Sequence, residues 1–288
     1  MKLAAIVVLY HPSAEVWHNI KSYASAVEAL ILIDNSPQAL EDAEGRWESF
    51  VSQVHYRHFS ENLGVASALN EGVQIALDVG CTHVLTMDQD SAFASGDIGV
   101  LCQIWNQLAQ TTRIGILSPN HTPNASLPDT SPRSTLLVMT SGNILSLEAY
   151  QACGRFEDKL FIDHVDHEYC LRLQQNGWQV WVAPSVVLAH GLGVQKSIRL
   201  LGLTCGSFIS HTPLRGYYMW RNGRWVSNKY RQKFPQFRRV VRKILFKEFI
   251  KTLLWENQRW ERLRLFWQAN QDYRQNRMGS WQPKKTKG

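Results

Sequence analysis

The sequence predicts an α/β fold with a mostly parallel sheet flanked by helices, followed by a basic helical appendage at the C-terminus. Strand-like segments alternate with helix-like segments through the first two thirds of the 288 residues. Several strand-like segments are apolar at nearly every position, as strands are when helices cover both faces of a sheet. Such repeats form parallel sheets with right-handed crossovers, and their ligands bind at the carboxyl ends of the strands.

The first half of the chain supplies four expected strands. They cover residues 4–10, 29–34, 53–59 and 82–88, and the helices expected between them cover 13–25, 39–50 and the later part of 62–80. Pro12 ends the first strand because its nitrogen carries no hydrogen for a sheet. The turn-forming run at 35–37 ends the second strand, and Gly80 closes the third helix. Asp34 and Asp88 then both stand at strand ends, which points to one crevice.

The second half continues the alternation before a basic segment. Strands are expected at residues 113–119, 135–143, 178–184 and 186–190, and helices at about 95–111, 146–152 and 166–176. Gly177 closes the last of these helices. Residues 191–214 show no clear period, and residues 234–273 have a helical pattern.

Charge is unevenly distributed along the chain. Residues 196–288 hold 22 of the 31 lysines and arginines but 4 of the 24 acids, a net charge of +18, whereas residues 1–195 have a net charge of −11. The basic part also holds six of the 11 tryptophans. This mixture suits an anionic membrane surface, although a solvated basic tail and a nucleic-acid binder share it. No apolar run reaches the ~20 residues of a transmembrane helix.

Two further patterns concern the compartment and the basic segment. The five cysteines form no Cys-x-x-Cys pair, which argues against a zinc site or a disulfide framework and favours a reducing compartment. Apolar residues keep helical spacing among the basic ones at Phe237, Val241, Ile244, Leu245, Phe249 and Leu253. This stripe can lie on a membrane, or it can pack against the rest of the protein.

The stretch "LTMDQDS" at residues 85–91 places Asp88 and Asp90 at the end of a strand. Side chains two apart in an extended segment point the same way, so both carboxylates can face one site. A hard divalent cation such as Mg²⁺ or Mn²⁺ would cancel their repulsion. Turn chemistry alone also produces this pattern.

Acidic residues gather in "FIDHVDHEYCLR" at 161–172, and a histidine follows a later strand. Asp163, Asp166 and Glu168 crowd a helix start, where one of them can act as a general base. They can equally be a helix cap and first-turn acids that the helix dipole favours. His190 is either a packed histidine or a metal ligand.

The loop "NLGVASALNEG" at residues 62–72 enters a helix whose start can lie near phosphate. It is neither a G-x-G-x-x-G nor a Walker motif, which argues against a dinucleotide dehydrogenase and a P-loop NTPase.

In this order, the motifs resemble the glycosyltransferases of family 2, which have the GT-A fold. The resemblance covers residues 3–225 and rests on "LIDNS", "NLGVASALNEG", "MDQDS", "TSGN", "FIDHVDHEYCLR" and "AHGLG". The D-Q-D-S form and the F-I-D-x-V-D-x-E-x-C-L-R form resemble the rhamnosyltransferase subgroup, as do residues 211–222 and 272–279. Many family members have an acid directly before the catalytic base, whereas this chain has Val165, as the rhamnosyltransferase-like members do.

The resemblance implies a role for each matched residue. Asp34 would read the nucleotide base, and Asp88 would lie near the ribose or the metal. Asp90 and His190 would complete the Mg²⁺ or Mn²⁺ site, and Asp166 would be the catalytic base. The remaining residues that the resemblance places in donor binding are Asn62, Gly64 and Arg215.

The resemblance also implies a function. The chain would be an inverting, metal-dependent enzyme that transfers L-rhamnose from dTDP-rhamnose to a lipid-linked saccharide in cell-surface polysaccharide or O-antigen synthesis. Residues 1–228 would form the catalytic domain and residues 229–288 a basic amphipathic region. We expect a cytoplasmic enzyme, peripheral on the inner face of the cell membrane, with no nucleic-acid partner. The alternatives are a UDP- or GDP-linked donor and a non-catalytic module that binds membranes or polyanions.

Overall fold

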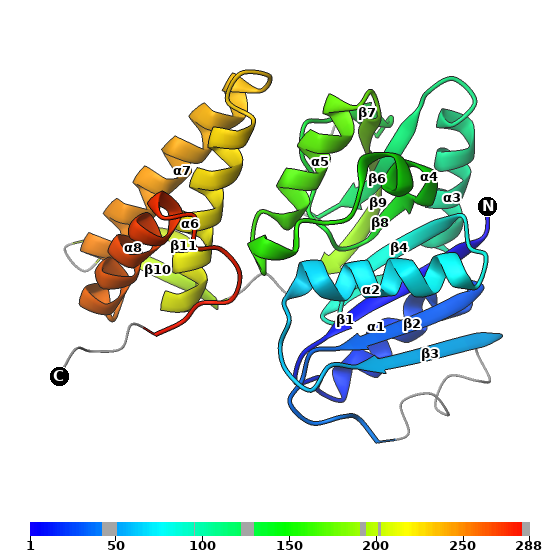
Figure 1. The fold of residues 1–288 in the computed structure, drawn as a ribbon, viewed down its shortest axis with the longest axis horizontal. Helices are drawn as coiled ribbons and strands as arrows, with labels where there is room; N and C mark the ends of the chain where they lie inside the picture. Colours follow the sequence, from blue (N-terminus) through cyan, green and yellow to red (C-terminus); the bar gives the residue numbers. More distant parts are fainter. Residues whose placement is uncertain (42–50, 95, 122–129, 191–193, 201–202, 284–288) are drawn as a thin grey trace. The chain divides into compact units, whose positions relative to one another are not determined.

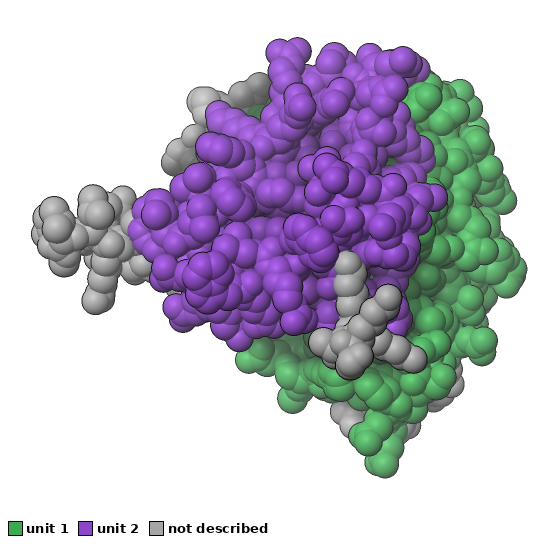
Figure 2. Space-filling model, turned by 60° about the vertical axis from the view of Figure 1, so that its left-hand side comes forward, with its two compact units in different colours: residues 1–161, 165–190 green, residues 162–164, 191–288 purple. Residues whose placement is uncertain are grey.

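The structure, a computed structural model, describes residues 1–41, 51–94, 96–121, 130–190, 194–200 and 203–283, with the backbone alone at 190–205. The chain divides into two compact units, which Figure 2 distinguishes by colour. The first unit contains Met1–Phe161 and Val165–His190, and the second contains Ile162–His164 and Gly191–Gly288. The proposed catalytic domain of residues 1–228 and the basic region of 229–288 are functional assignments, and they stay predictions.

The first unit is built on a mixed sheet. Its described strands lie in the order β3-β2-β1-β4-β8-β6-β9-β5, with β7 paired to β9 (Figure 1). The strands are β1 (Leu3–Leu9), β2 (Ala29–Asp34), β3 (Gln53–His58), β4 (His83–Asp88), β5 (Ser91–Phe93), β6 (Ile114–Asn120), β7 (Arg133–Ser134), β8 (Asn143–Ser146) and β9 (Gln179–His190). β3, β2, β1 and β4 are mutually parallel, whereas β8 runs antiparallel between β4 and β6. The predicted α/β class with a mostly parallel sheet is confirmed.

Helices flank this sheet. They are α1 (Glu15–Ala24), α2 (Val65–Asp78), α3 (Asp97–Leu108), α4 (Leu147–Cys153) and α5 (Val165–Gln175), with a short 3₁₀ turn at Asp158–Leu160. Alternate residues of β1, such as Val7, join α1 and α3 in the core. On the other face, a Cβ atom at Gly72 of α2 would meet Cγ2 of Ile6 at 2.4 Å. The absence of a side chain at position 72 therefore lets α2 lie close to β1.

The second unit combines a hairpin with three helices. Its elements are β10 (Val194–Leu200), β11 (Leu203–Ser210), α6 (Pro213–Lys229), α7 (Pro235–Leu254) and α8 (Arg259–Arg274). α6 packs against both α7 and α8. Within the stripe predicted on α7, Phe237, Val241 and Leu245 are buried, whereas Ile244 and Phe249 are 42% and 36% exposed. Among the described residues, no helix is long and apolar enough to span a bilayer.

Three predicted strands need correction. Residues 135–142 are not a strand, since β8 begins at Asn143, after a turn in which Gly142 has a φ of 78°. The N–H of Gly142 donates to the carbonyl of Thr86, which sets the point where β8 joins β4. The strands expected at 178–184 and 186–190 are one strand, β9, whose register with β6 shifts between Pro119 and Asn120. This irregularity accommodates Pro184 within β9, since proline cannot donate to a ladder.

Other elements were missed or lie outside the described residues. The hairpin of β10 and β11 has no alternation that would have revealed it. α6 carries a recognisable start, because Thr212 accepts a hydrogen bond from the N–H of Arg215 and Pro213 follows it. The helix expected at 234–273 is two helices, α7 and α8, separated by residues 255–258. Most of the helix expected at 39–50 lies outside the described residues.

The close approach of α2 to β1 predicts an unequal response of two helical glycines. Gly72→Ala should lower the free energy of unfolding by ~1–3 kcal/mol, because the added methyl group overpacks the buried Ile6. Gly99→Ala in α3 has open space around it, so better helix propensity should leave stability unchanged or raise it by up to ~1 kcal/mol. Urea unfolding of both variants measures the difference. Equal stabilities would contradict the packing argument.

Candidate functional site

Two acidic residues meet at one edge of the sheet. β1 pairs with β2 so that Leu9 lies opposite Asp34, and it pairs with β4 so that Val8 lies opposite Asp88. Both acids therefore stand at the carboxyl edge of the sheet, on either side of the end of β1. This is the placement that the sequence predicted, and it is where ligands bind in sheets of this kind.

Asp34 is fully buried, and both of its oxygens are engaged. Oδ1 accepts from the N–H of Ser36 and Oδ2 accepts from the hydroxyl of Tyr56, each at 2.8 Å. Burial, together with the adjacent carboxylate, raises the pKa of Tyr56 to about 12, so its hydroxyl stays protonated and donates. Each carboxylate oxygen keeps a second lone pair for another donor.

The end of β2 also holds the loop that precedes α2. The side chain of Asn35 donates to the carbonyl of Gly64 at 3.3 Å and accepts from the N–H of Leu63 at 3.2 Å. Asn62 accepts from the N–H of Gly64 at 2.9 Å. Gly64 has a φ of 87°, and a Cβ atom there would meet the carbonyl oxygen of Phe161 at 2.5 Å. Position 64 therefore requires glycine on grounds of both conformation and space.

A turn follows Asp88. β4 ends at Asp88, and Gln89 and Asp90 form the turn before β5, so the extended geometry expected for both acids stops at Asp88. The side chain of Gln89 accepts from the N–H of Tyr10 at 2.8 Å and donates to its carbonyl at 3.1 Å. Gln89 therefore fixes the turn to the end of β1. Asp88 is half-buried and Asp90 is exposed, and the N–H of Asp88 donates to the hydroxyl of Ser141 at 3.0 Å.

The sheet brings the backbone of His190 next to this turn. β5 and β9 are antiparallel, with Ser91 opposite His190. The side chain of His190 lies outside the described residues, and no three His, Cys, Asp or Glu side chains among those described form a cluster. Two carboxylates only two residues apart suit a divalent cation, and an imidazole from the adjacent strand would suit Mn²⁺ in particular.

The acids at the start of α5 have different environments. Glu168 is fully buried and forms a two-pronged ion pair with Arg172, in which Nε lies 3.2 Å from Oε1 and Nη2 contacts Oε2. Arg172 also donates to the carbonyls of Cys153 and Arg155, at 3.3 Å and 2.6 Å. Glu168 therefore anchors α5 to the segment after α4, and its carboxylate is committed to that role.

Asp166 is half-buried in the first turn of α5, where Oδ1 accepts from the N–H of His167 at 2.7 Å. It lines a hollow of about 10 Å³, room for about one water. Two buried atoms of the lining residues, Oδ1 of Asn143 and the hydroxyl of Tyr169, have no hydrogen-bond partner among the described residues. Burial raises the pKa of the Cys170 thiol to about 12, so this neighbour stays protonated at neutral pH. Asp166 is therefore the group beside the hollow that can accept a proton.

The segment before α5 has an unusual backbone. Phe161, Asp163 and His164 have φ values of 65°, 60° and 65°, in the left-handed region that non-glycine residues rarely adopt. In the second unit, Asn222 of α6 donates to the carbonyls of residues 162 and 163 at 2.7 Å and 3.1 Å, and Arg215 lies 3.2 Å from a carboxylate oxygen of Asp163. Strain of this kind is typical of functional loops.

Sequence reasoning missed the residues that hold the site. Asn35 and Ser141 lie within the quoted motifs "LIDNS" and "TSGN", yet each side chain bonds to a backbone group far away in sequence, and Ser141 also donates to the hydroxyl of Ser91. Asn70, in the loop motif, is another, since its amide oxygen accepts from the hydroxyl of Tyr150 and the N–H of Phe156, both at 2.8 Å. Their presence in motifs was the available signal, and their partners depend on the fold.

Two sequence comparisons indicate one enzyme class, and several solved structures share the fold. Residues 6–123 match the family described as "Glycosyl transferase family 2". The "dTDP-rhamnosyl transferase RfbF" of Shigella flexneri is 26% identical over 243 residues, which cover 76% of this chain and 77% of that protein. Among solved structures, S. aureus TarS has a TM-score of 0.62 at 12% identity, over 96% of this chain and about half (49%) of TarS.

Two ligand-bound structures also resemble this fold. S. aureus TarS 1–349 in complex with UDP-GlcNAc has a TM-score of 0.60 at 11% identity and covers 96% of this chain and 81% of that one. GalNAc-T7 with UDP, GalNAc and Mn²⁺ has a TM-score of 0.58 at 11% identity, over 96% of this chain and 56% of that one.

The hydrogen bonds of Asn35 to the loop before α2 predict that substitution of two asparagines will change stability by different amounts. Asn35→Ala should lower the free energy of unfolding by ~1–3 kcal/mol, because it leaves two loop backbone groups without their partner at a buried position. Asn62→Ala removes one bond at an exposed position and should cost less than ~1 kcal/mol. Urea unfolding compares the two variants. A larger loss for Asn62→Ala would show that Asn35 does not hold the loop.

Proposed function

The chain is a glycosyltransferase with the GT-A fold and a family 2 domain at residues 6–123, and on this premise we propose that it transfers L-rhamnose from dTDP-β-L-rhamnose to a saccharide. The observation that carries the choice of donor is the 26% identity to a dTDP-rhamnosyl transferase over 76% of the chain. The D-Q-D-S form of the acidic motif supports the same choice. UDP- and GDP-linked sugars are the alternative donors.

The proposed metal is Mg²⁺ or Mn²⁺, held by Asp88, Asp90 and His190. The pairing of β5 with β9 supports this set, since it places the backbone of His190 opposite Ser91, beside Asp90. The Mn²⁺ in the GalNAc-T7 structure supports a divalent cation in a protein of the same fold. When bound, such a cation neutralises the charge of a diphosphate leaving group.

Asp166 is the proposed general base. Glu168 is committed to Arg172 and Asp163 lies by Arg215, which leaves Asp166 as the acid with a free role beside a polar hollow. Its carboxylate would take the proton from the acceptor hydroxyl, whose oxygen attacks the anomeric carbon from the face opposite the diphosphate. The single displacement inverts the configuration, so the product is an α-L-rhamnoside.

The donor nucleotide is proposed to bind at the edge formed by Asp34, Asp88 and the loop at residues 62–64. Asp34 would accept one more hydrogen bond from the base through a remaining lone pair. Asn62 and Gly64 would shape the loop at the start of α2, whose N-terminal end favours phosphate. Arg215 is the further residue proposed for the diphosphate, on the strength of the resemblance; its side chain is about half exposed, and only its Nε contacts Asp163 in the described structure.

The proposed acceptor is a lipid-linked saccharide at the inner face of the cell membrane, in polysaccharide or O-antigen assembly. The basic residues of α7 and its exposed apolar side chains support peripheral binding to an anionic leaflet. A cytoplasmic location is proposed from the nucleotide-sugar donor, and the free cysteines among the described residues support it. A non-catalytic module that binds membranes or polyanions is the remaining alternative.

Donor specificity and metal dependence can be tested together. Release of dTDP from dTDP-rhamnose should require Mg²⁺ or Mn²⁺, should stop with EDTA and should return when metal is added. Asp90→Ala should lower the rate at least about 100-fold, because cation stabilisation of the leaving group is worth several kcal/mol. Asp78→Ala, at the far end of α2, is the control and should keep the wild-type rate. Turnover of a UDP- or GDP-sugar in place of dTDP-rhamnose would contradict the proposed donor. Turnover without a metal would contradict the proposed metal dependence.

The two acids of α5 should separate chemistry from stability. Asp166→Asn should lower kcat by ~10²–10⁴-fold with unchanged unfolding, because it removes a base that makes few internal contacts. Glu168→Gln should lower the free energy of unfolding by ~3–5 kcal/mol, because it leaves Arg172 without its charged partner. Initial rates and urea unfolding of both variants give the comparison. A fully active Asp166→Asn variant would transfer the role of base to another group.

A further inference from the structure

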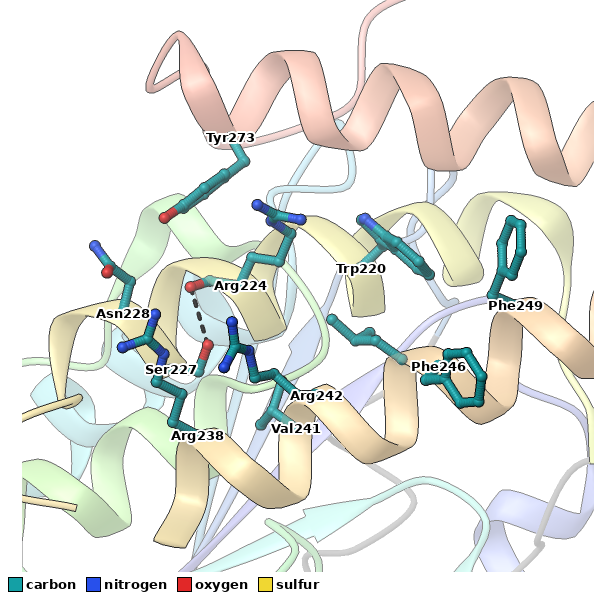
Figure 3. Close-up of a pocket in the computed structure, with 11 residues that line it drawn as sticks. Trp220, Arg224, Ser227, Asn228, Arg238, Val241, Arg242, Phe246, Phe249 and Tyr273 are labelled. Atoms are coloured by element: carbon teal, nitrogen blue, oxygen red, sulfur yellow. Dashed lines mark hydrogen bonds between the residues drawn. The ribbon is translucent and has the colours of Figure 1, made fainter. Parts of the chain in front are cut away.

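The second unit contains a cavity of about 550 Å³, lined by α6, α7 and α8 (Figure 3). This volume lies within the range of about 300–1,000 Å³ that is typical of small-molecule sites. Figure 3 shows that the two ends of the cavity differ in chemistry. Arg224, Arg238 and Arg242 gather at one end, and aromatic side chains, including Phe246 and Phe249, lie at the other.

The arginine end has the properties of a phosphate site. Among the described residues, none of the three arginines forms an ion pair, and no acid lines the cavity. Nε of Arg224 is buried without a hydrogen-bond partner in the described part, while its guanidinium lies over the ring of Tyr273, 4.9 Å from the centroid. Three like charges in one cavity repel each other, so a ligand with several negative charges is favoured. Guanidinium groups match phosphate oxygens in two-pronged hydrogen bonds.

The aromatic end has the properties of a hydrocarbon site that opens to the surface. Trp220 stacks on Phe266 with ring centroids 4.7 Å apart, which makes it a fixed wall. Phe246 is 66% exposed although it lines the cavity. Other large apolar side chains of the second unit are also exposed: Ile244, Leu254, Trp255, Trp260 and Trp267. Exposed apolar groups beside a basic surface are typical of proteins that contact the interface of a bilayer.

We propose that this cavity binds the phosphate or diphosphate headgroup of a membrane lipid at the three arginines, with the first part of its hydrocarbon chain along Phe246 and Phe249. A phosphate monoester or a diphosphate fits three unpaired cations better than a singly charged phosphodiester does. The inference rests on the proposed function in one respect: the lipid would be the carrier of the acceptor saccharide rather than a bulk phospholipid. The residues proposed for the sugar-transfer chemistry do not line this cavity.

Direct binding of farnesyl diphosphate, measured by calorimetry on the full chain, tests the arginine end. The double variant Arg238→Ala/Arg242→Ala should weaken binding at least about tenfold, because it removes charged hydrogen bonds. The matched control Arg239→Ala/Lys243→Ala removes the same charge from exposed positions of α7 that do not line the cavity, so it should bind like wild type. Equal weakening by both variants would show a diffuse surface charge and would overturn the site.

The aromatic end is tested by a second pair of variants and by a ligand without hydrocarbon. Phe246→Ser should weaken farnesyl diphosphate binding about three- to tenfold, through the loss of apolar burial, whereas Val240→Ser, also exposed but outside the cavity, should not. Inorganic diphosphate should bind at least about tenfold more weakly than farnesyl diphosphate, since it buries no apolar surface. Equal affinity for the two ligands would show that the cavity binds phosphate but not hydrocarbon, and would contradict the proposal that it binds a lipid.

Vesicle binding identifies the source of the lipid. Two kinds of phosphatidylcholine vesicle are compared, one containing a polyprenyl diphosphate and the other containing phosphatidylglycerol, at equal total charge. Wild type should bind the vesicles with polyprenyl diphosphate more tightly. The variant Arg238→Ala/Arg242→Ala should abolish this preference. Equal binding would overturn the carrier lipid. Release of dTDP from dTDP-rhamnose should be unaffected by this variant, because the reaction with water needs no lipid. If the wild-type protein released no dTDP from dTDP-rhamnose, the proposed donor alone would be contradicted. If the variant bound lipid as wild type does, the cavity alone would be contradicted.

Discussion

The parallel pairing of β1 with β2 and β4 is the constraint on which the candidate site depends. All six residues of β2 are buried, and so is β1 except for one position that is partly buried, which means that apolar burial holds the three strands together. A slip of one residue would turn every side chain to the opposite face, so the register is strongly determined. That register places Asp34 opposite Leu9 and Asp88 opposite Val8. Forces that have nothing to do with ligands thus bring the two acids to one edge.

The environments of the acids distinguish those that stabilise the fold from those proposed to bind metal or transfer a proton. Asp34 accepts from Ser36 and Tyr56, and Glu168 is neutralised by Arg172, so both are costly to remove from their partners. Asp90 is exposed and Asp166 is half-buried, whereas Asp34 and Glu168 are fully buried. Carboxylates that must exchange ligands or protons are expected in the second class. The division was invisible in the sequence, where all of these residues are simply acids at strand or helix ends.

Local patterns predicted what local forces decide. The apolar runs gave the central strands, and the strand ends at Asp34 and Asp88 were correct because strand endings are set by neighbouring residues. The run at 135–142 failed because Gly142 and its bond to Thr86 delay the strand until Asn143. The strands expected at 178–184 and 186–190 are one strand, because a register shift accommodates Pro184 within it. The partners of Asn35, Gln89 and Arg172 could not be predicted, since each depends on tertiary contacts.

The two proposed phosphate sites lie in parts of the chain with opposite net charge. Residues 1–195 carry a net charge of −11, so a diphosphate donor approaching their acidic edge would meet an unfavourable field. A divalent cation between Asp88 and Asp90 would reverse the local sign, which is the physical case for a metal in the proposed reaction. Residues 196–288 carry +18 and need no metal, because arginines can contact phosphate directly. A cation at the donor edge can be chelated away, whereas the arginine cavity is a permanent feature of the fold, so donor binding and lipid binding should respond differently to the removal of metal.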